Sequence, residues 1–134
     1  MSNKQNQISN YMSSFAFTVN RDANALDVAD KLKRNKFGAA LVMDADSLAG
    51  IVTERDYLMH LHQLIENPET PVSELMTSDL TCIESTASVC EGKRIMIEKN
   101  IRHLPVINQG HVEGILSIKD IFKALDQLLP GPES

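Results

Sequence analysis

The sequence of 134 residues repeats itself at an offset of 64 positions, so that residues 11–61 align with residues 75–125 without a gap. Identical residues keep one register along the whole alignment. They are Met12 and Met76, Ser14 and Ser78, Ala23 and Ala87, Val42 and Val106, Gly50 and Gly114, Ile51 and Ile115, Asp56 and Asp120, and Leu61 and Leu125. Such a repeat is one structural unit present twice, and a single copy cannot bury its apolar face alone. We therefore expect two similar units.

Each copy predicts the same order of elements: strand, helix, strand, strand, helix. In the first copy these elements are expected at residues 17–20, 25–36, 39–43, 48–53 and 54–65. In the second copy they are expected at residues 80–83, 89–99, 103–107, 112–117 and 118–129. The alternation of strands and helices predicts a mixed α/β (α+β) fold.

Local signals support individual helices and a linker. Leu26, Ala29 and Leu32 recur at helical spacing in the first helix of copy one. Ser88, followed three residues later by Glu91, is a capping-box signature at the start of the matching helix in copy two. Residues 67–71 contain two prolines, which exclude a continuous helix between the copies.

These signals predict the organisation of the chain. Two motifs should pack sheet to sheet with pseudo-two-fold symmetry and leave clefts at their junction. The predicted parts are a flexible tail at 1–7, the first motif at 8–66, a linker at 67–71, the second motif at 72–129 and a flexible tail at 130–134.

Composition limits the classes of partner. With 13 Lys and Arg against 18 Asp and Glu the formal net charge is −5, which disfavours nucleic acid as a partner. Cys82 and Cys90 form no disulfide framework, and we expect small buried thiols in a reducing compartment. The polar residues 1–10 do not resemble a signal peptide, and no apolar stretch reaches membrane-spanning length, so a cytoplasmic location is expected.

Two matching segments carry a family resemblance. Residues 50–57, Gly-Ile-Val-Thr-Glu-Arg-Asp-Tyr, and residues 114–120, Gly-Ile-Leu-Ser-Ile-Lys-Asp, resemble the signature that closes a cystathionine-β-synthase (CBS) motif. Residues 101–106 resemble the strand entry of the second motif of a pair, and Leu75-Met76-Thr77 resembles its opening. The chain is thus similar to small stand-alone CBS pairs, also called Bateman modules.

The resemblance implies a regulatory module and no catalysis. Such pairs are often homodimers that bind AMP, ADP, ATP, S-adenosylmethionine or NAD in two clefts and signal to a partner protein, whose identity the sequence leaves open. No cofactor is expected, and no nucleophile or metal-site motif is recognisable. The alternatives are a dimerisation module with degenerate, empty clefts and an enzyme acting on nucleotides.

The chemistry of the signature suits a nucleotide. Thr53 and Ser117 are placed to cap a helix, with Asp56 and Asp120 at the third helical position. Free backbone N–H groups at such a helix start favour phosphate, and Arg55 or Lys119 adds positive charge. A carboxylate there can accept hydrogen bonds from two ribose hydroxyls. A hydroxyl followed three residues later by an acid is equally an ordinary helix cap, and one residue can serve both purposes.

Further ligand contacts are implied by the resemblance alone. Thr18 fits the threonine that the first strand of a motif often offers, whereas its counterpart is Cys82, which puts equal binding by the second cleft in doubt. Ala39 and Ala40 would let an adenine ring lie against the backbone, and Arg102 and His103 could contact phosphate. A strand histidine bonded to a neighbour is an equal alternative for His103. Pro105 and Ile83 complete the predicted site.

Dimer contacts are predicted on the closing helices, where apolar residues follow a helical period. Burial within the monomer is the alternative for the same side chains. They are Leu58, Leu61, Leu125 and Leu128.

Overall fold

The computed structural model describes residues 6–128, which divide into two compact units. Residues 17–80 form the unit that we call the first-repeat unit. Residues 6–16 and 81–128 together form the second-repeat unit. Residues 1–5 of the tail predicted at 1–7, the whole tail predicted at 130–134 and the predicted helix end at Leu129 lie outside the described residues.

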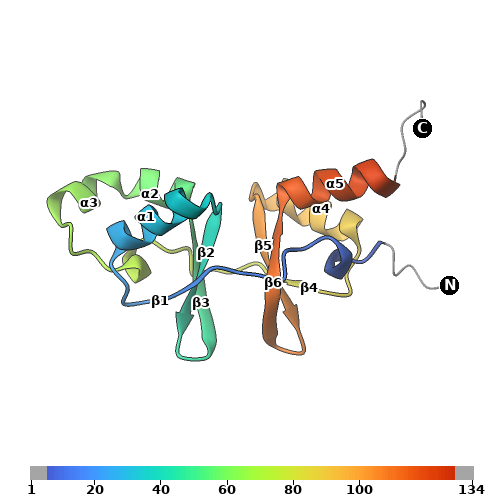
Figure 1. The fold of residues 1–134 in the computed structure, drawn as a ribbon, viewed down its shortest axis with the longest axis horizontal. Coiled ribbons are helices and arrows are strands. Elements are labelled where there is room, and N and C mark those ends of the chain that lie inside the picture. The colour runs from blue at the N-terminus through green and yellow to red at the C-terminus, as the bar shows by residue number, and fades with distance from the viewer. Residues whose placement is uncertain (1–5, 129–134) are drawn as a thin grey trace. The chain divides into compact units, whose positions relative to one another are not determined.

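The first-repeat unit contains a three-stranded sheet with the strand order β1-β2-β3 (Figure 1). Strand β1 pairs in parallel with β2, and β2 pairs antiparallel with β3. Its elements are β1 (Thr18–Asn20), α1 (Ala25–Asn35), β2 (Ala39–Asp44), β3 (Ser47–Thr53), α2 (Glu54–Met59), α3 (Leu61–Glu66) and the 3-10 helix η3 (Val72–Glu74).

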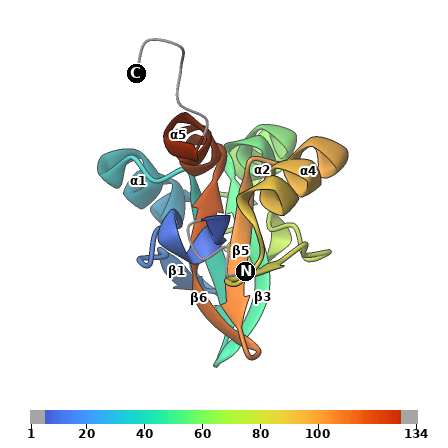
Figure 2. The same cartoon turned by 90° about the vertical axis from the view of Figure 1, so that its right-hand side faces the viewer.

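The second-repeat unit has the same topology, with the strand order β4-β5-β6. Its elements are the 3-10 helix η2 (Ile8–Asn10), β4 (Ile83–Glu84), α4 (Val89–Lys99), β5 (His103–Asn108), β6 (His111–Ser117) and α5 (Ile118–Leu128). In Figure 2 the β5–β6 hairpin of this unit extends away from helix α5. The predicted mixed α/β fold, with one strand-helix-strand-strand-helix order in each repeat, is confirmed.

Each unit has its own apolar core. In the first-repeat unit, helix α1 buries Ala25, Val28 and Leu32, which follow the i, i+3, i+7 spacing of one helix face. The predicted inward position of Leu26 is wrong, since its side chain is 42% exposed. The face of α1 that packs in the core therefore begins one residue earlier than the face we inferred, at the small Ala25.

The prediction of one closing helix at 54–65 is wrong in one respect, because the helix is interrupted at His60. His60 ends α2 with φ −114° and ψ 18°, outside helical geometry. Its ring nitrogen Nδ1 lies 2.9 Å from the Asp56 carbonyl oxygen, which also accepts the His60 backbone N–H. Side-chain bonding to a carbonyl of the preceding turn competes with continuation of the helix.

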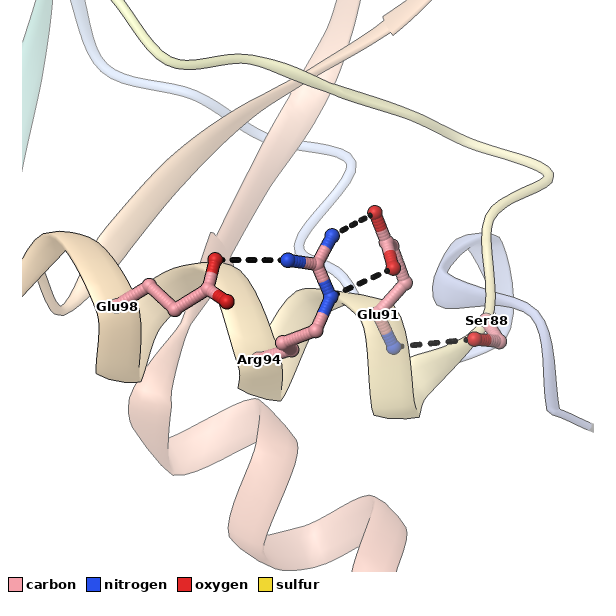
Figure 3. A network of polar contacts seen from close by, with 4 residues as sticks. All are labelled: Ser88, Glu91, Arg94 and Glu98. Carbon is pink, nitrogen blue, oxygen red and sulfur yellow. Dashed lines mark hydrogen bonds and ion pairs between the residues drawn. The ribbon is translucent and has the colours of Figure 1, made fainter.

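Helix α4 begins with half of the predicted capping box (Figure 3). The Ser88 hydroxyl accepts a hydrogen bond from the Glu91 backbone N–H at 3.0 Å. The Glu91 carboxylate instead pairs with Arg94 at 2.6 Å, and Arg94 also pairs with Glu98 at 2.7 Å. These carboxylates raise the pKa of Arg94, so the guanidinium stays charged and links two turns of the helix.

The prediction of two buried thiols is wrong. Cys90 is exposed on the first turn of α4, and Cys82 is only partly buried. Burial is nevertheless sufficient to raise the pKa of Cys82. Within residues 6–128, no helix has the length and apolar composition needed to cross a membrane.

The segments that open the two repeats are exchanged between the units. Residues 6–16 belong to the second-repeat unit and run past strand β6 (Figure 1), and Ile8 is fully buried in that core. Ser13 exchanges two backbone hydrogen bonds of 3.0 Å with Ile115 of β6. Each copy of the sequence repeat thus gives its opening residues to the sheet of the other copy.

The matching segment of the second copy packs on the first-repeat unit. Thr77 exchanges backbone hydrogen bonds of 3.0 Å and 2.9 Å with Ile51 of β3, and Val72 and Leu75 are buried in the core. The residues predicted as a linker are also ordered against this unit. Thr70 is fully buried, and its carbonyl oxygen accepts the Ala25 N–H at 2.9 Å.

The opening segment of each repeat crosses an edge strand, at Ser13 beside β6 and at Thr77 beside β3. These two backbone crossings explain why a glycine starts each signature. A Cβ at Gly50 would lie 2.7 Å from the Met76 sulfur and 2.8 Å from the Thr77 carbonyl oxygen. A Cβ at Gly114 would overlap the Ser13 carbonyl oxygen. Backbone atoms held by a pair of hydrogen bonds cannot move aside cheaply, so both positions require glycine.

The crossing predicts that Gly114→Ala destabilises the protein by about 2–4 kcal/mol, through overlap with backbone. Urea unfolding followed by circular dichroism measures this cost. Gly110→Ala is the matched control, because Gly110 has φ +81° with open space around its Cβ position. It should lose only about 1–2 kcal/mol, from the left-handed backbone alone. Equal losses in both variants would contradict a steric role for the crossing.

Candidate ligand site

The first-repeat sheet brings three predicted residues to one end. Thr53, the last residue of β3, lies in register with Ala39, the first residue of β2. Thr18 begins β1, which runs parallel to β2, and its side chain is exposed. Ala40 is fully buried in the core, so its side chain faces inward within this unit.

Asp56 is held by the turn that joins β3 to α2. Its Oδ2 accepts the Thr53 backbone N–H at 2.8 Å and the Thr53 hydroxyl at 3.2 Å. Its Oδ1 accepts the Thr77 hydroxyl at 2.9 Å. Thr53 and Asp56 also form a reciprocal capping box. The cap that the sequence offered as an alternative is therefore present, while Arg55 beside it is exposed.

Asp120 has the corresponding place at the start of α5. Its Oδ2 accepts the Ser117 backbone N–H at 2.8 Å, and its own N–H donates to the Ser117 hydroxyl at 3.2 Å. Helix α5 is an unbroken helix of 11 residues, whereas α2 has 6. Lys119 is exposed on the first turn of α5.

The remaining predicted residues of the second repeat are divided between the surface and the core. His103 lies in register with Ser117 at the same end of the sheet and is half-buried. Arg102 is exposed, and its carbonyl oxygen accepts the Ile118 N–H at 2.9 Å, which fixes this turn to the start of α5. Pro105 and Ile83 are buried.

Residues 53–56 and residues 117–120, which each run from the capping hydroxyl to the acid, are called the first and the second tetrad below. Sequence reasoning missed two residues at the first tetrad. Thr77 was recognised only as part of a motif opening, and its contact with Asp56 depends on the segment exchange. Tyr57 donates its hydroxyl to the Ala25 carbonyl oxygen at 2.6 Å and so ties α2 to the first turn of α1. Burial, followed by the nearby Asp56 charge, raises the pKa of Tyr57 to about 12.

A metal centre is not formed by the described side chains. Within residues 6–128 no three His, Cys, Asp or Glu residues lie close enough together to hold an ion. The histidine and acid pair of helix α3, His62 and Glu66, lies on an exposed surface at 3.3 Å. The two tetrads are the places where both repeats carry the same kinds of polar side chain: a hydroxyl, a cation and an acid.

The sequence was compared with models of known families. The model of the CBS domain matches twice, over residues 8–63 and residues 72–127. The chain belongs to the CBS-domain family. Both matches include an opening segment and a closing helix, so the two tetrads lie at equivalent places in two CBS domains.

Proteins similar to this chain include some of comparable length and longer ones. The CBS domain-containing protein YhcV of Bacillus subtilis is 28% identical over 104 residues, which are 78% of this chain and 74% of the relative. A 33.4 kDa protein of Thermofilum pendens is 37% identical over 99 residues, 72% of this chain but 32% of its own length. A solved structure of a protein with CBS domains from Burkholderia ambifaria is 34% identical, with a TM-score of 0.81 and 90% of each chain covered.

Two further structures share the fold and were solved with adenosine derivatives. CBSX2 in complex with AMP is 24% identical, with a TM-score of 0.80 over 92% of this chain and 98% of that one. The CBS pair of MJ0100 in complex with 5′-methylthioadenosine and S-adenosylmethionine is 19% identical, with a TM-score of 0.78 over 91% and 97%. At these identities the likeness shows the CBS-pair fold.

The raised pKa of Tyr57 predicts a loss of stability in alkali. The folded state favours the neutral phenol, so this contribution is complete below pH 10 and is lost as the pH rises towards 12. Tyr57→Phe should lower the free energy of unfolding at pH 7 by about 1 kcal/mol, from the lost hydrogen bond. The difference between wild type and variant should shrink between pH 10 and 12, as measured by urea unfolding. A difference independent of pH would contradict the assignment.

Proposed function

We propose that this CBS pair is a non-catalytic regulatory module that binds an adenosine derivative at its two tetrads. The ribose hydroxyls would donate to Asp56 or Asp120, and Arg55 or Lys119 would attract a phosphate. Binding would then be signalled to a regulated protein or through a homodimer. No resident cofactor is needed for this role.

The observation that carries the proposal is the repetition of one polar arrangement at equivalent places. Asp56 and Asp120 each accept the N–H of the hydroxyl residue three positions earlier at 2.8 Å. This bond fixes a charged acceptor in one orientation before any ligand arrives, which reduces the ordering cost of binding. A cap alone explains the acid and the hydroxyl, but it does not require a cation beside the acid in both repeats.

The CBS pairs crystallised with AMP and with S-adenosylmethionine support the ligand class. AMP, 5′-methylthioadenosine and S-adenosylmethionine share an adenosine with a free ribose diol and differ in the charge of the 5′ substituent. A carboxylate recognises the shared diol through charge-assisted hydrogen bonds. Arg55 and Lys119 favour the anionic members of this class.

Replacing either acid by its amide should weaken binding. Asp120→Asn and Asp56→Asn keep an oxygen for the cap but remove the charge that strengthens the bonds to ribose. The dissociation constant for AMP at the altered site should rise about 10- to 100-fold in isothermal titration calorimetry. The double variant should lose binding at both sites.

The control for lost helix capping is Ser88→Ala, which removes the cap of α4 at a place outside both tetrads. It should lose about 1 kcal/mol of stability and keep the affinity for AMP. A second arm uses 2′-deoxy-AMP, which lacks one hydroxyl of the diol and should bind wild type about tenfold more weakly than AMP. Amide variants that bind AMP as tightly as wild type would exclude these acids from the site.

A dimerisation module that binds no ligand is the second candidate, favoured by exposed apolar side chains on α2 and α3. Leu58 is 74% exposed and Met59 77%, and Leu61 and Ile65 are also exposed. Of the predicted dimer contacts on α5, Leu125 and Leu128 are instead partly buried against the core of their own unit. Several exposed apolar side chains on two successive short helices favour an interaction site there.

If α2 and α3 hold two copies together, Leu58→Ser with Met59→Ser should convert a dimer into a monomer in sedimentation velocity, because the apolar contact is lost. Leu26→Ser on α1 is the control, and it should leave the sedimentation coefficient unchanged. A wild-type protein that stays monomeric at about 100 μM would remove homodimerisation from both candidates.

A further inference from the structure

Asp56 of the first tetrad accepts a hydrogen bond that the sequence repeat does not predict. In the first-repeat unit the Thr77 hydroxyl donates to Asp56 Oδ1 at 2.9 Å. Thr77 reaches this carboxylate because its backbone is paired with Ile51, two residues before Thr53 on the same strand. The contact therefore comes from the exchanged opening segment and not from the tetrad itself.

The counterpart of Thr77 in the other unit makes a different contact. Ser13 lies 64 positions earlier and pairs in the same way with β6, at Ile115. Its hydroxyl donates to the Phe15 carbonyl oxygen at 2.8 Å and accepts the Phe15 N–H at 3.3 Å. This hydroxyl is satisfied within its own turn. Among residues 6–128, the hydrogen bonds of the Asp120 side chain join it to Ser117 alone.

The accepting capacity of the carboxylates gives this difference a consequence. A carboxylate has about four lone-pair sites, two on each oxygen. Asp56 uses three of them, two on Oδ2 for Thr53 and one on Oδ1 for Thr77. One site remains, which serves one ribose hydroxyl. Two adjacent hydroxyls need a second site, and the bond from Thr77 is the one that can be released without loss of the cap.

We propose that the Thr77 hydroxyl competes with the ribose diol for Asp56, and that an adenosine ligand therefore fills the Asp120 tetrad before the Asp56 tetrad. The inference rests on the proposed function of the tetrads. Thr77 thereby acts as an affinity-determining residue of the first tetrad. It makes two sites of similar sequence unequal.

A positioning role for Thr77 is the competing explanation. A hydroxyl can raise affinity when it holds a carboxylate in its binding orientation. Asp56 is already held by the Thr53 N–H and hydroxyl, so a further donor adds little orientation. The Thr77 side chain is exposed, and on release its hydroxyl can rotate into water. Competition therefore costs the ligand one charge-assisted hydrogen bond to Asp56. The affinity gained from a better oriented carboxylate is smaller than this loss.

The test isolates the first tetrad in an Asp120→Asn background. Thr77→Val keeps the branched shape and removes the donor, and Thr77→Ala also removes the methyl group that could crowd the carboxylate. Isothermal titration with AMP, and in parallel with S-adenosylmethionine, measures affinity at Asp56. Both Thr77 variants should bind about 3- to 10-fold more tightly than the Asp120→Asn parent. Ser13→Ala in the same background is the matched control and should leave the affinity unchanged.

The outcomes separate this inference from the function on which it rests. Parent binding that neither Thr77 variant tightens overturns the competition, and weaker binding in both variants assigns Thr77 a positioning role instead. An equal gain in the Ser13 control also overturns it, because the effect would then not arise at Asp56. Absence of binding by wild type to either ligand overturns the proposed function and this inference together. Binding by wild type that both Asp→Asn variants retain overturns the tetrad site.

Discussion

The backbone crossing at the start of each signature is the constraint on which the structure of both units depends. Ser13 pairs with Ile115, and Thr77 pairs with Ile51, each through two hydrogen bonds. These bonds satisfy edge groups of β6 and β3 that would otherwise lie open. Glycine is needed beside each crossing because a Cβ would strike the crossing chain.

The crossing also connects packing to chemistry. It buries Ile8 in the core of one unit and Val72 and Leu75 in the core of the other. A segment fixed in this way presents its polar side chains at a defined place beside the strand that ends in a tetrad. Only Thr77 uses that position to reach the acid, whereas Ser13 turns to its own chain. The hydrogen bond from Thr77 is thus one of the differences between two halves of nearly equal topology.

Helix capping and the proposed ligand recognition draw on the same atoms. Asp56 and Asp120 each accept a hydrogen bond from a backbone N–H group at the start of α2 or α5, and this bond also orients the carboxylate. A residue that stabilises a helix start can be retained for that reason after a ligand site is lost. The cation that precedes each acid in the sequence is therefore more informative about binding than the acid and the hydroxyl, which a cap alone explains.

The sequence by itself determined the duplicated α/β order, with the bounds of most elements to within a few residues. It also determined the closing signature and its pairs of hydroxyl and acid. These features depend on local spacing, which a repeat makes visible twice. Only the tertiary structure decided that residues 6–16 pack in the second-repeat unit and residues 67–80 in the first-repeat unit. It also decided that α2 ends at His60 and that Leu26 and Cys90 are exposed. Thr77 beside Asp56 belongs to this second group, because 21 positions of chain separate the two residues and only the folded segment brings them together.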